Sequence, residues 1–85
     1  MEEKLIGKIT HYFTNIGVGV IEITQGDLKG GDKIHIKGAT SDFEQTIDSM
    51  QIEHENIEKA KKGDAIGLKV DQQVREGDQV FKIVE

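Results

Sequence analysis

The sequence predicts an all-β protein that folds as a closed or nearly closed barrel of six strands. Its apolar runs are short and closely spaced, they mostly alternate with period two, and most of the ten glycines fall between them. Closure suits a chain of this size because it leaves no long exposed edges. The third observation is a repeat of Gly-Asp, one free residue and a β-branched aliphatic, in Gly31-Asp32-Lys33-Ile34, Gly63-Asp64-Ala65-Ile66 and Gly77-Asp78-Gln79-Val80.

Each repeat is typical of a turn that starts a strand. Glycine adopts positive φ without strain, and we expect the aspartate carboxylate to accept hydrogen bonds from N–H groups one or two residues further on. A fourth pair, Gly26-Asp27, lies just upstream of the first repeat. A calcium loop would need several oxygen ligands at alternating positions, whereas each repeat offers one aspartate. The repeats therefore indicate architecture, not metal binding.

Composition limits the function classes further. The 85 residues predict one domain, 1–85, and the absence of cysteine excludes disulfides and thiolate metal sites. No apolar run approaches the roughly 20 residues of a membrane span, and residues 1–4 lack the pattern of a secretory signal. We therefore expect a cytoplasmic protein without membrane contact. The net charge of −5 disfavours nucleic acid, unless a local basic stripe overrides it.

The first two predicted strands contain irregular patterns. In residues 5–13, alternation places Ile9 and Phe13 on one face and Lys8, Thr10 and Tyr12 on the other, while Ile6 breaks the parity and predicts a local irregularity. In residues 16–24, Ile16, Val18 and Val20 share one parity and Ile21 and Ile23 the other. Either a bulge near Val20-Ile21 exchanges the faces or the strand is covered on both sides.

Four further strands complete the predicted barrel. One covers residues 33–37, and another runs from Phe43 to about His54, with a change of phase around Asp48-Ser49 that indicates a bulge. Residues 53–62 are too short for an independent helix, so we expect a single helical or 3₁₀ turn before Gly63. The last two strands cover residues 64–70 and 79–84.

These elements occur in an order that resembles a known family. Four segments resemble elements in the second domain of translational GTPases such as elongation factor Tu. Residues 26–36 are similar to its Gly-x-Leu/Ile-Lys-x-Gly-Asp/Glu-x-Ile/Val element, and residues 47–52 to its central strand. Residues 60–68 are similar to its Ala-x-x-Gly-Asp/Glu-x-Val-Gly-Leu element, and residues 74–80 to its closing Arg-x-Gly-Asp/Gln-Val element. The resemblance runs from about Ile6 to Ile83 and implies a Greek-key barrel of the translation-protein type. Small barrels of this type also occur as accessory domains, including the tails of some collagenase-like peptidases.

The chain offers no catalytic template. It contains no Gly-x-x-x-x-Gly-Lys-Ser/Thr phosphate loop, so neither GTP binding nor GTP hydrolysis follows from the resemblance. Its histidines, His11, His35 and His54, do not have the spacing of metal ligands. There is no cysteine nucleophile and no serine in a strand-elbow-helix motif. We therefore expect no cofactor, no metal and no enzymatic activity.

Two groups of residues are candidates for a binding surface. Alternation places Lys33, His35 and Lys37 on one strand face, near Lys29, where they could meet RNA phosphates; the alternative is a lysine-rich strand that blocks edge pairing. Tyr12, beside His11 and Lys8, could stack on a base or anchor a protein, or simply pack its ring at the end of the barrel. Asp42 and Glu44 alternate along one strand face, as solvated surface charges do.

Two functions remain open from the sequence. The first is a binding module associated with RNA or the ribosome, which the resemblance favours because this barrel contacts ribosomal RNA in family members. The second is a protein-interaction or accessory module for a partner enzyme, such as the tail of a peptidase. The acidic net charge favours the second function.

Overall fold

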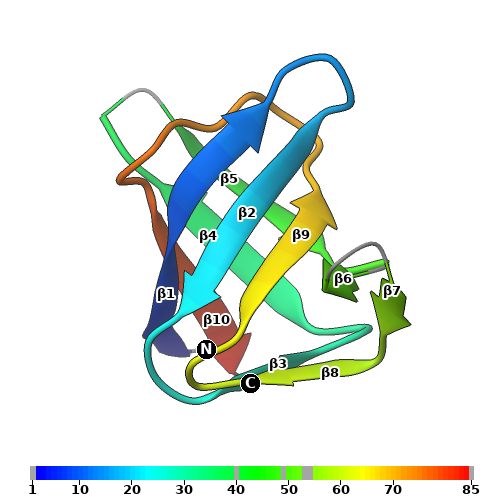
Figure 1. Ribbon diagram of the computed structural model, residues 1–85. Helices are drawn as coiled ribbons and strands as arrows, with labels where there is room; N and C mark the ends of the chain where they lie inside the picture. Colours follow the sequence, from blue (N-terminus) through cyan, green and yellow to red (C-terminus); the bar gives the residue numbers. More distant parts are fainter. Residues whose placement is uncertain (1, 40, 49, 53–54, 85) are drawn as a thin grey trace.

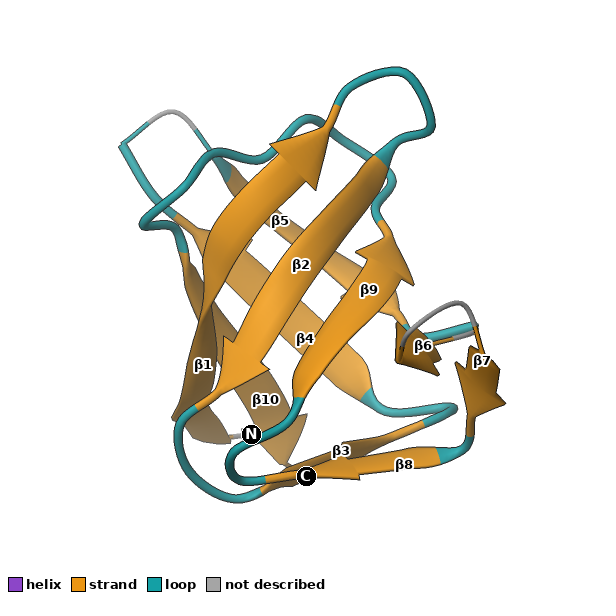
Figure 2. Ribbon diagram, in the orientation of Figure 1, coloured by secondary structure: helices purple, strands orange, loops and turns teal. Residues whose placement is uncertain are grey.

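The computed structural model describes residues 2–39, 41–48, 50–52 and 55–84 and confirms an all-β protein (Figure 2). Ten strands follow one another, with no helix among the described residues. Their bounds are β1 Glu2–Phe13, β2 Val18–Ile23, β3 Asp27–Lys29, β4 Lys33–Lys37, β5 Asp42–Thr46, β6 Met50–Ile52, β7 Glu55–Ile57, β8 Lys59–Lys61, β9 Ala65–Lys69 and β10 Gln79–Val84.

Eight of these strands form one antiparallel sheet, in the order β5-β4-β10-β1-β2-β9-β6-β7. The sheet curls so strongly that β1, β2 and β9 lie in front of β10, β4 and β5, with the core between them (Figure 1). The remaining two strands, β3 and β8, pair as a separate sheet across one end of the core. The two ends of the described chain lie side by side, because Glu2 of β1 pairs with Val84 of β10.

The expected closed barrel of six strands is wrong. The edges of the large sheet are β5 and β7, and no ladder in the described residues joins them. A side chain bridges part of the gap: Gln45 donates from Nε2 to the carbonyl oxygen of Lys69 at 3.0 Å and accepts at Oε1 from the N–H of Asp71 at 2.9 Å. Gln45 is itself buried, so both ends of its amide need these partners. The side-chain amide of Gln45 thus connects two parts of the sheet at a place where a closed barrel would have backbone hydrogen bonds between strands.

The expected helical turn within residues 53–62 is also wrong. This segment contains β7 and β8, and in β8 the register places Ala60 opposite Leu28 of β3, with both residues fully buried. Pairing with β3 provides hydrogen-bond partners for backbone N–H and C=O groups that a single helical turn would leave without partners. Tertiary context therefore overrides the local helical pattern. The expected end of the preceding strand, near His54, lies outside the described residues; β6 ends at Ile52.

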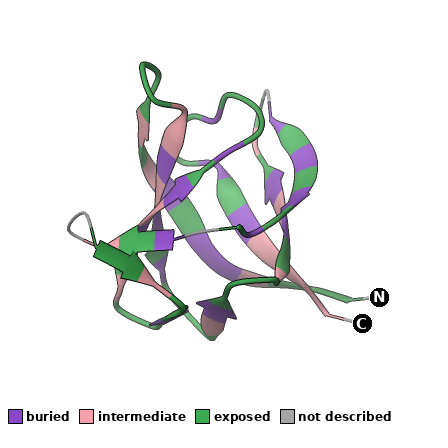
Figure 3. Cartoon of the chain, turned by 90° about the vertical axis from the view of Figure 1, so that its right-hand side faces the viewer, coloured by how far each residue is buried: buried purple, intermediate pink, exposed green. Residues whose placement is uncertain are grey.

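One hydrophobic core fills the space inside the curled sheet, and buried residues alternate with more exposed ones along the strands (Figure 3). In β4, for example, Ile34 and Ile36 are fully buried between exposed lysines. Ile47 and Met50 are both buried although they differ in parity, because the chain leaves β5 after Thr46 and enters β6 at Met50. The expected change of phase is therefore present, but as a break between two strands and not as a bulge within one; Ser49 lies outside the described residues.

Two irregularities in β1 set which side chains face the core. The register against β10 shifts between Leu5 and Gly7, which confirms the irregularity expected at Ile6. The register against β2 shifts between Ile9 and His11, so the parity reverses after Ile9. Phe13 is therefore 45% exposed and Tyr12 packs against the core, the opposite of what alternation predicted. In β2 itself alternation is regular, and the bulge considered near Val20-Ile21 lies instead in its partner strand.

The three Gly-Asp repeats form the same turn. Gly31, Gly63 and Gly77 have φ values of 92°, 95° and 91°, which favour glycine at the third position of the turn. The aspartate that follows each glycine donates its N–H to the carbonyl oxygen three residues earlier. Its carboxylate accepts from the N–H of that same residue, so the expectation that it would bind N–H groups further on is wrong. The N–H groups of Lys29, Lys61 and Arg75 donate to Oδ2 of Asp32, Asp64 and Asp78, respectively, each at 3.0 Å.

Candidate functional site

The expected basic row is only partly assembled. Lys33, His35 and Lys37 lie on the outer face of β4, as alternation predicted. Lys29, however, lies on β3, in the other sheet. Lys33 pairs with Glu44 of the neighbouring strand β5, with 3.4 Å between Nζ and Oε1, and the register places Lys37 opposite Asp42. Acidic side chains of β5 therefore flank the row, which weakens any field it could present to phosphates.

His35 is held between two carboxylates. Its Nδ1 lies 2.6 Å from Oε1 of Glu3 in β1, and its Nε2 lies 2.5 Å from Oδ1 of Asp42 in β5. Because ionised carboxylates only accept hydrogen bonds, this geometry suits a protonated ring in which both nitrogens donate. The bond to Asp42 and then that to Glu3 raise the pKa of His35 above its ordinary value, against the opposing effect of burial. The same bond lowers the pKa of Asp42.

This arrangement predicts a pH-dependent stability. Because the pKa of His35 is higher in the folded chain than in the unfolded chain, its contribution is complete below about pH 6.5 and is lost as the pH rises through the folded value. Urea denaturation between pH 6 and pH 9 should show the unsubstituted protein losing stability relative to His35→Gln. At the acidic end the sign reverses, since the lowered pKa of Asp42 gives stability that is lost as the pH falls below about 4.

A matched pair of substitutions controls this prediction. Glu3→Gln removes one of the two carboxylates and should flatten the dependence between pH 6 and pH 9, whereas Glu2→Gln makes the same change one residue earlier, away from the ring. If the free energy of unfolding changed equally with pH in the unsubstituted protein and in His35→Gln, the protonated His35 would not hold β1, β4 and β5 together.

The second candidate group lies on β1 and does not join the first. Lys8 is exposed and lies opposite Glu22 of β2. His11 is exposed, with its Nδ1 3.6 Å from Oε1 of Glu76 and its ring edge-on to Phe13 at 4.4 Å between centroids. Tyr12 is half-buried and packs against the core, as in the alternative that places its ring at the end of the fold. The seven candidate residues therefore do not converge on one site.

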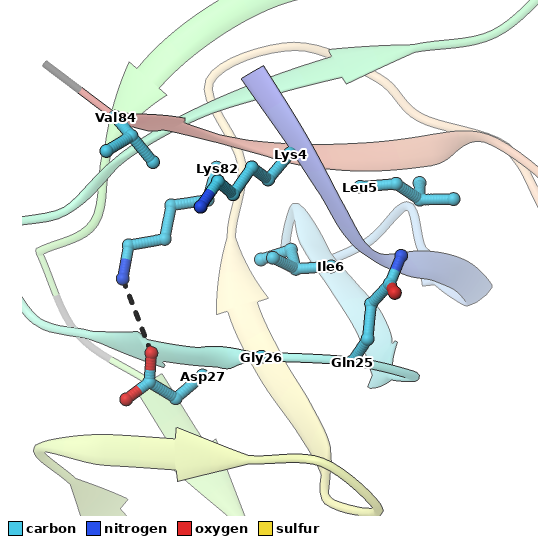
Figure 4. A pocket seen from close by; sticks show the side chains of 8 residues that line it. All are labelled: Lys4, Leu5, Ile6, Gln25, Gly26, Asp27, Lys82 and Val84. Carbon is cyan, nitrogen blue, oxygen red and sulfur yellow. Dashed lines mark hydrogen bonds and ion pairs between the residues drawn. The ribbon is translucent and has the colours of Figure 1, made fainter. Parts of the chain in front are cut away.

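A groove of about 620 Å³ lies between β1, β3 and β10, and no pattern in the sequence predicted it (Figure 4). Its wall is largely apolar, with Leu5, Ile6 and Val84, and at its rim Lys82 reaches Oδ1 of Asp27 at 3.4 Å. Asp27 also pairs with Lys59 of β8, and Lys82 with Asp32, each at 3.4 Å. The bonds to Lys59 and then Lys82 lower the pKa of Asp27. Two lysines and two aspartates thus neutralise one another, and they join β3 to β8 and β10.

A second missed surface lies on the outer face of the large sheet. We define the outer apolar patch as Phe13, Ile16, Val18, Val20, Ala65 and Gly67. In the described residues, Phe13 and Ile16 are the large hydrophobic side chains that remain exposed, at 45% and 63%. The sequence carried a signal for this patch, because Ile16, Val18 and Val20 share the parity opposite to the buried Ile21 and Ile23.

The described residues contain no group of three histidine, aspartate or glutamate side chains that could hold a metal ion. Within the same residues, no helix is long and apolar enough to cross a membrane.

Comparison with known proteins connects the chain to peptidases. No family model matches it. It is 42% identical over 81 residues, which are 94% of this chain, to an uncharacterized protease of Methanocaldococcus jannaschii. It is 34% identical over 82 residues, or 95% of this chain, to a collagenase of Porphyromonas gingivalis. The chain spans only 20% and 23% of the lengths of these two relatives.

A solved structure shares the fold. The crystal structure of the C-terminal domain of a Geobacillus thermoleovorans putative U32 peptidase superposes with a TM-score of 0.87, covering 95% of this chain and 93% of that domain at 17% identity. Because the match covers nearly all of both chains, the two share the same overall fold.

These comparisons overturn the resemblance to the second domain of translational GTPases. The relatives found along nearly the whole chain are named as a protease and a collagenase, and the matching structure is a peptidase domain. The error has a physical origin: the quoted motifs are glycine turns and buried strand residues, which small curled β-sheets share irrespective of function. The accessory module of a peptidase, the alternative from the sequence, is the better supported of the two functions.

Proposed function

We propose that this chain is a non-catalytic module that serves a peptidase through protein contact. The observation that carries the proposal is the coverage: the similarity includes 94% of this chain but only a fifth of the M. jannaschii protease. This chain therefore corresponds to one compact unit of the relative, and the remaining four-fifths of the relative is available to carry the catalytic site. The structural match to an isolated C-terminal domain supports the same division.

The distribution of side chains supports binding over catalysis. The titratable groups with shifted pKa values, Asp27, His35 and Asp42, are each held in ion pairs that join strands. Their partners are other side chains of the same fold, and none of the three lies in a converging set of nucleophile, base and orienting group. Stabilising the fold is sufficient to explain these shifts.

The experiment is recovery of the protein from the organism that encodes it. A tag at the genomic locus recovers the encoded protein together with whatever it binds by contact, and mass spectrometry identifies the bound proteins. The proposal predicts a peptidase similar to the M. jannaschii protease, recovered equally with and without nuclease. Ribosomal proteins or tRNA that disappear after nuclease treatment would instead restore the RNA-binding function.

A further inference from the structure

The outer apolar patch extends across adjacent strands of the large sheet. The register between β1, β2, β9 and β6 places His11, Val20, Gly67 and Gln51 in one row across the outer face. Phe13 lies beside Val18 in the neighbouring row. Solvent-facing positions of an antiparallel sheet normally carry polar side chains, so an apolar stretch over several strands indicates a surface that something covers.

The outer apolar patch is hollowed. A groove of about 330 Å³ lies over it, and its lining consists of the six residues of the patch together with Gln51 and Ile66. Ala65 and Gly67 form a low floor because neither has a long side chain. A Cβ added to Gly67 would lie 3.4 Å from Cγ1 of Val18, so the glycine keeps this depression open. Such a shape accepts a protruding side chain.

Charge distinguishes among the molecules that could fill the groove. The residues that line it carry no charged side chain, although the whole protein has a net charge of −5. Beside the groove, the register places Lys69 opposite Val18 and Glu22 opposite Ala65, two charges of opposite sign. A phosphate or carboxylate placed in the groove would lose its hydration without a counter-charge from the lining, and Glu22 would oppose its binding. An uncharged apolar side chain loses little hydration and buries the exposed surface of Phe13 and Ile16.

We infer that the outer apolar patch binds an uncharged, apolar segment of the peptidase that this module serves. This inference rests on the proposed function and adds the surface and the chemistry of the contact. Phe13 and Ile16, which are the large exposed members, contribute most of the binding, and Gly67 provides the depression for the protruding side chain. The basic side chains of β4 lie outside the contact.

The test compares recovery of the peptidase by the tagged protein and by two variants. Phe13→Ser with Ile16→Ser removes the exposed apolar groups and should reduce recovery by about tenfold or more. Lys33→Ser with Lys37→Ser is the matched control, two truncations on β4, and should leave recovery unchanged. Unchanged melting curves of the purified variants establish that both still fold, as expected for exposed positions.

Hydrogen exchange on the unsubstituted complex tests the inference without any variant. Amides of residues 13–20 should exchange more slowly in the recovered complex than in the chain alone. Slower exchange confined to another region, such as the groove near Lys82, would overturn the patch while leaving the proposed function intact. Failure to recover any peptidase overturns both. Equal loss of recovery in the two double variants also contradicts the inference.

Discussion

Replacing Leu28 with alanine is expected to lower the free energy of unfolding by about 3 kcal/mol. Leu28 is fully buried and lies opposite Ala60 in the two-stranded sheet that covers one end of the core. Truncation removes apolar contacts and leaves a cavity, and the small Ala60 cannot refill it. Urea denaturation at constant pH measures the loss, with the midpoint falling at an unchanged slope.

Ile16→Ala is the control for this prediction, because it makes a similar truncation at a residue that is 63% exposed. It should change the free energy of unfolding by less than about 0.5 kcal/mol. A loss below about 1 kcal/mol for Leu28→Ala would show that β3 and β8 do not seal the core. Residues 59–61, which pair with β3, would then contribute little to the stability of the core.

The second large effect is expected at Gly7, in the irregular part of β1. An added Cβ would collide with the carbonyl oxygen of Glu22 and lie 3.3 Å from Cγ2 of Ile21. Because the obstacle is backbone of the paired strand, Gly7→Ala relaxes only by moving β1 away from β2. We expect a loss of about 3 kcal/mol, the upper end for an overpacked core, measured by the same denaturation.

Gly30→Ala is the matched control. Gly30 lies in the first Gly-Asp turn, its φ is not in the positive range, and an added Cβ meets nothing within 4 Å. Alanine here should leave stability unchanged or raise it slightly by restricting the unfolded chain. Equal behaviour of the two variants would contradict the close approach of β1 and β2 at Gly7.

Much of the fold could be predicted from local sequence signals. Alternation located the strand at residues 33–37, and the change of phase after Ile47 located the break between β5 and β6. Prediction failed where pairing between distant segments decides the structure. Residues 59–61 form a strand because 27–29 lie beside them, and nothing within either segment shows this. One bulge between Ile9 and His11 was enough to exchange the faces of Tyr12 and Phe13.

The candidate surface was harder to predict than the fold. Alternation correctly placed Lys33, His35 and Lys37 on one face, but it could not show that Glu3, 32 residues before His35, would reach the ring from β1. The acidic side chains that flank the basic row come from other strands. The apolar parity of Ile16, Val18 and Val20 was visible in the sequence, and only the sheet order shows that no second layer covers it among the described residues.

The recovery from the genomic tag, with and without nuclease, tests the central claim most directly. If this chain is a module that serves a peptidase, a peptidase similar to the M. jannaschii protease is the principal product in both preparations and its amount does not depend on nuclease. If the principal product is RNA or ribosomal protein and it disappears with nuclease, the chain serves nucleic acid and the claim is wrong.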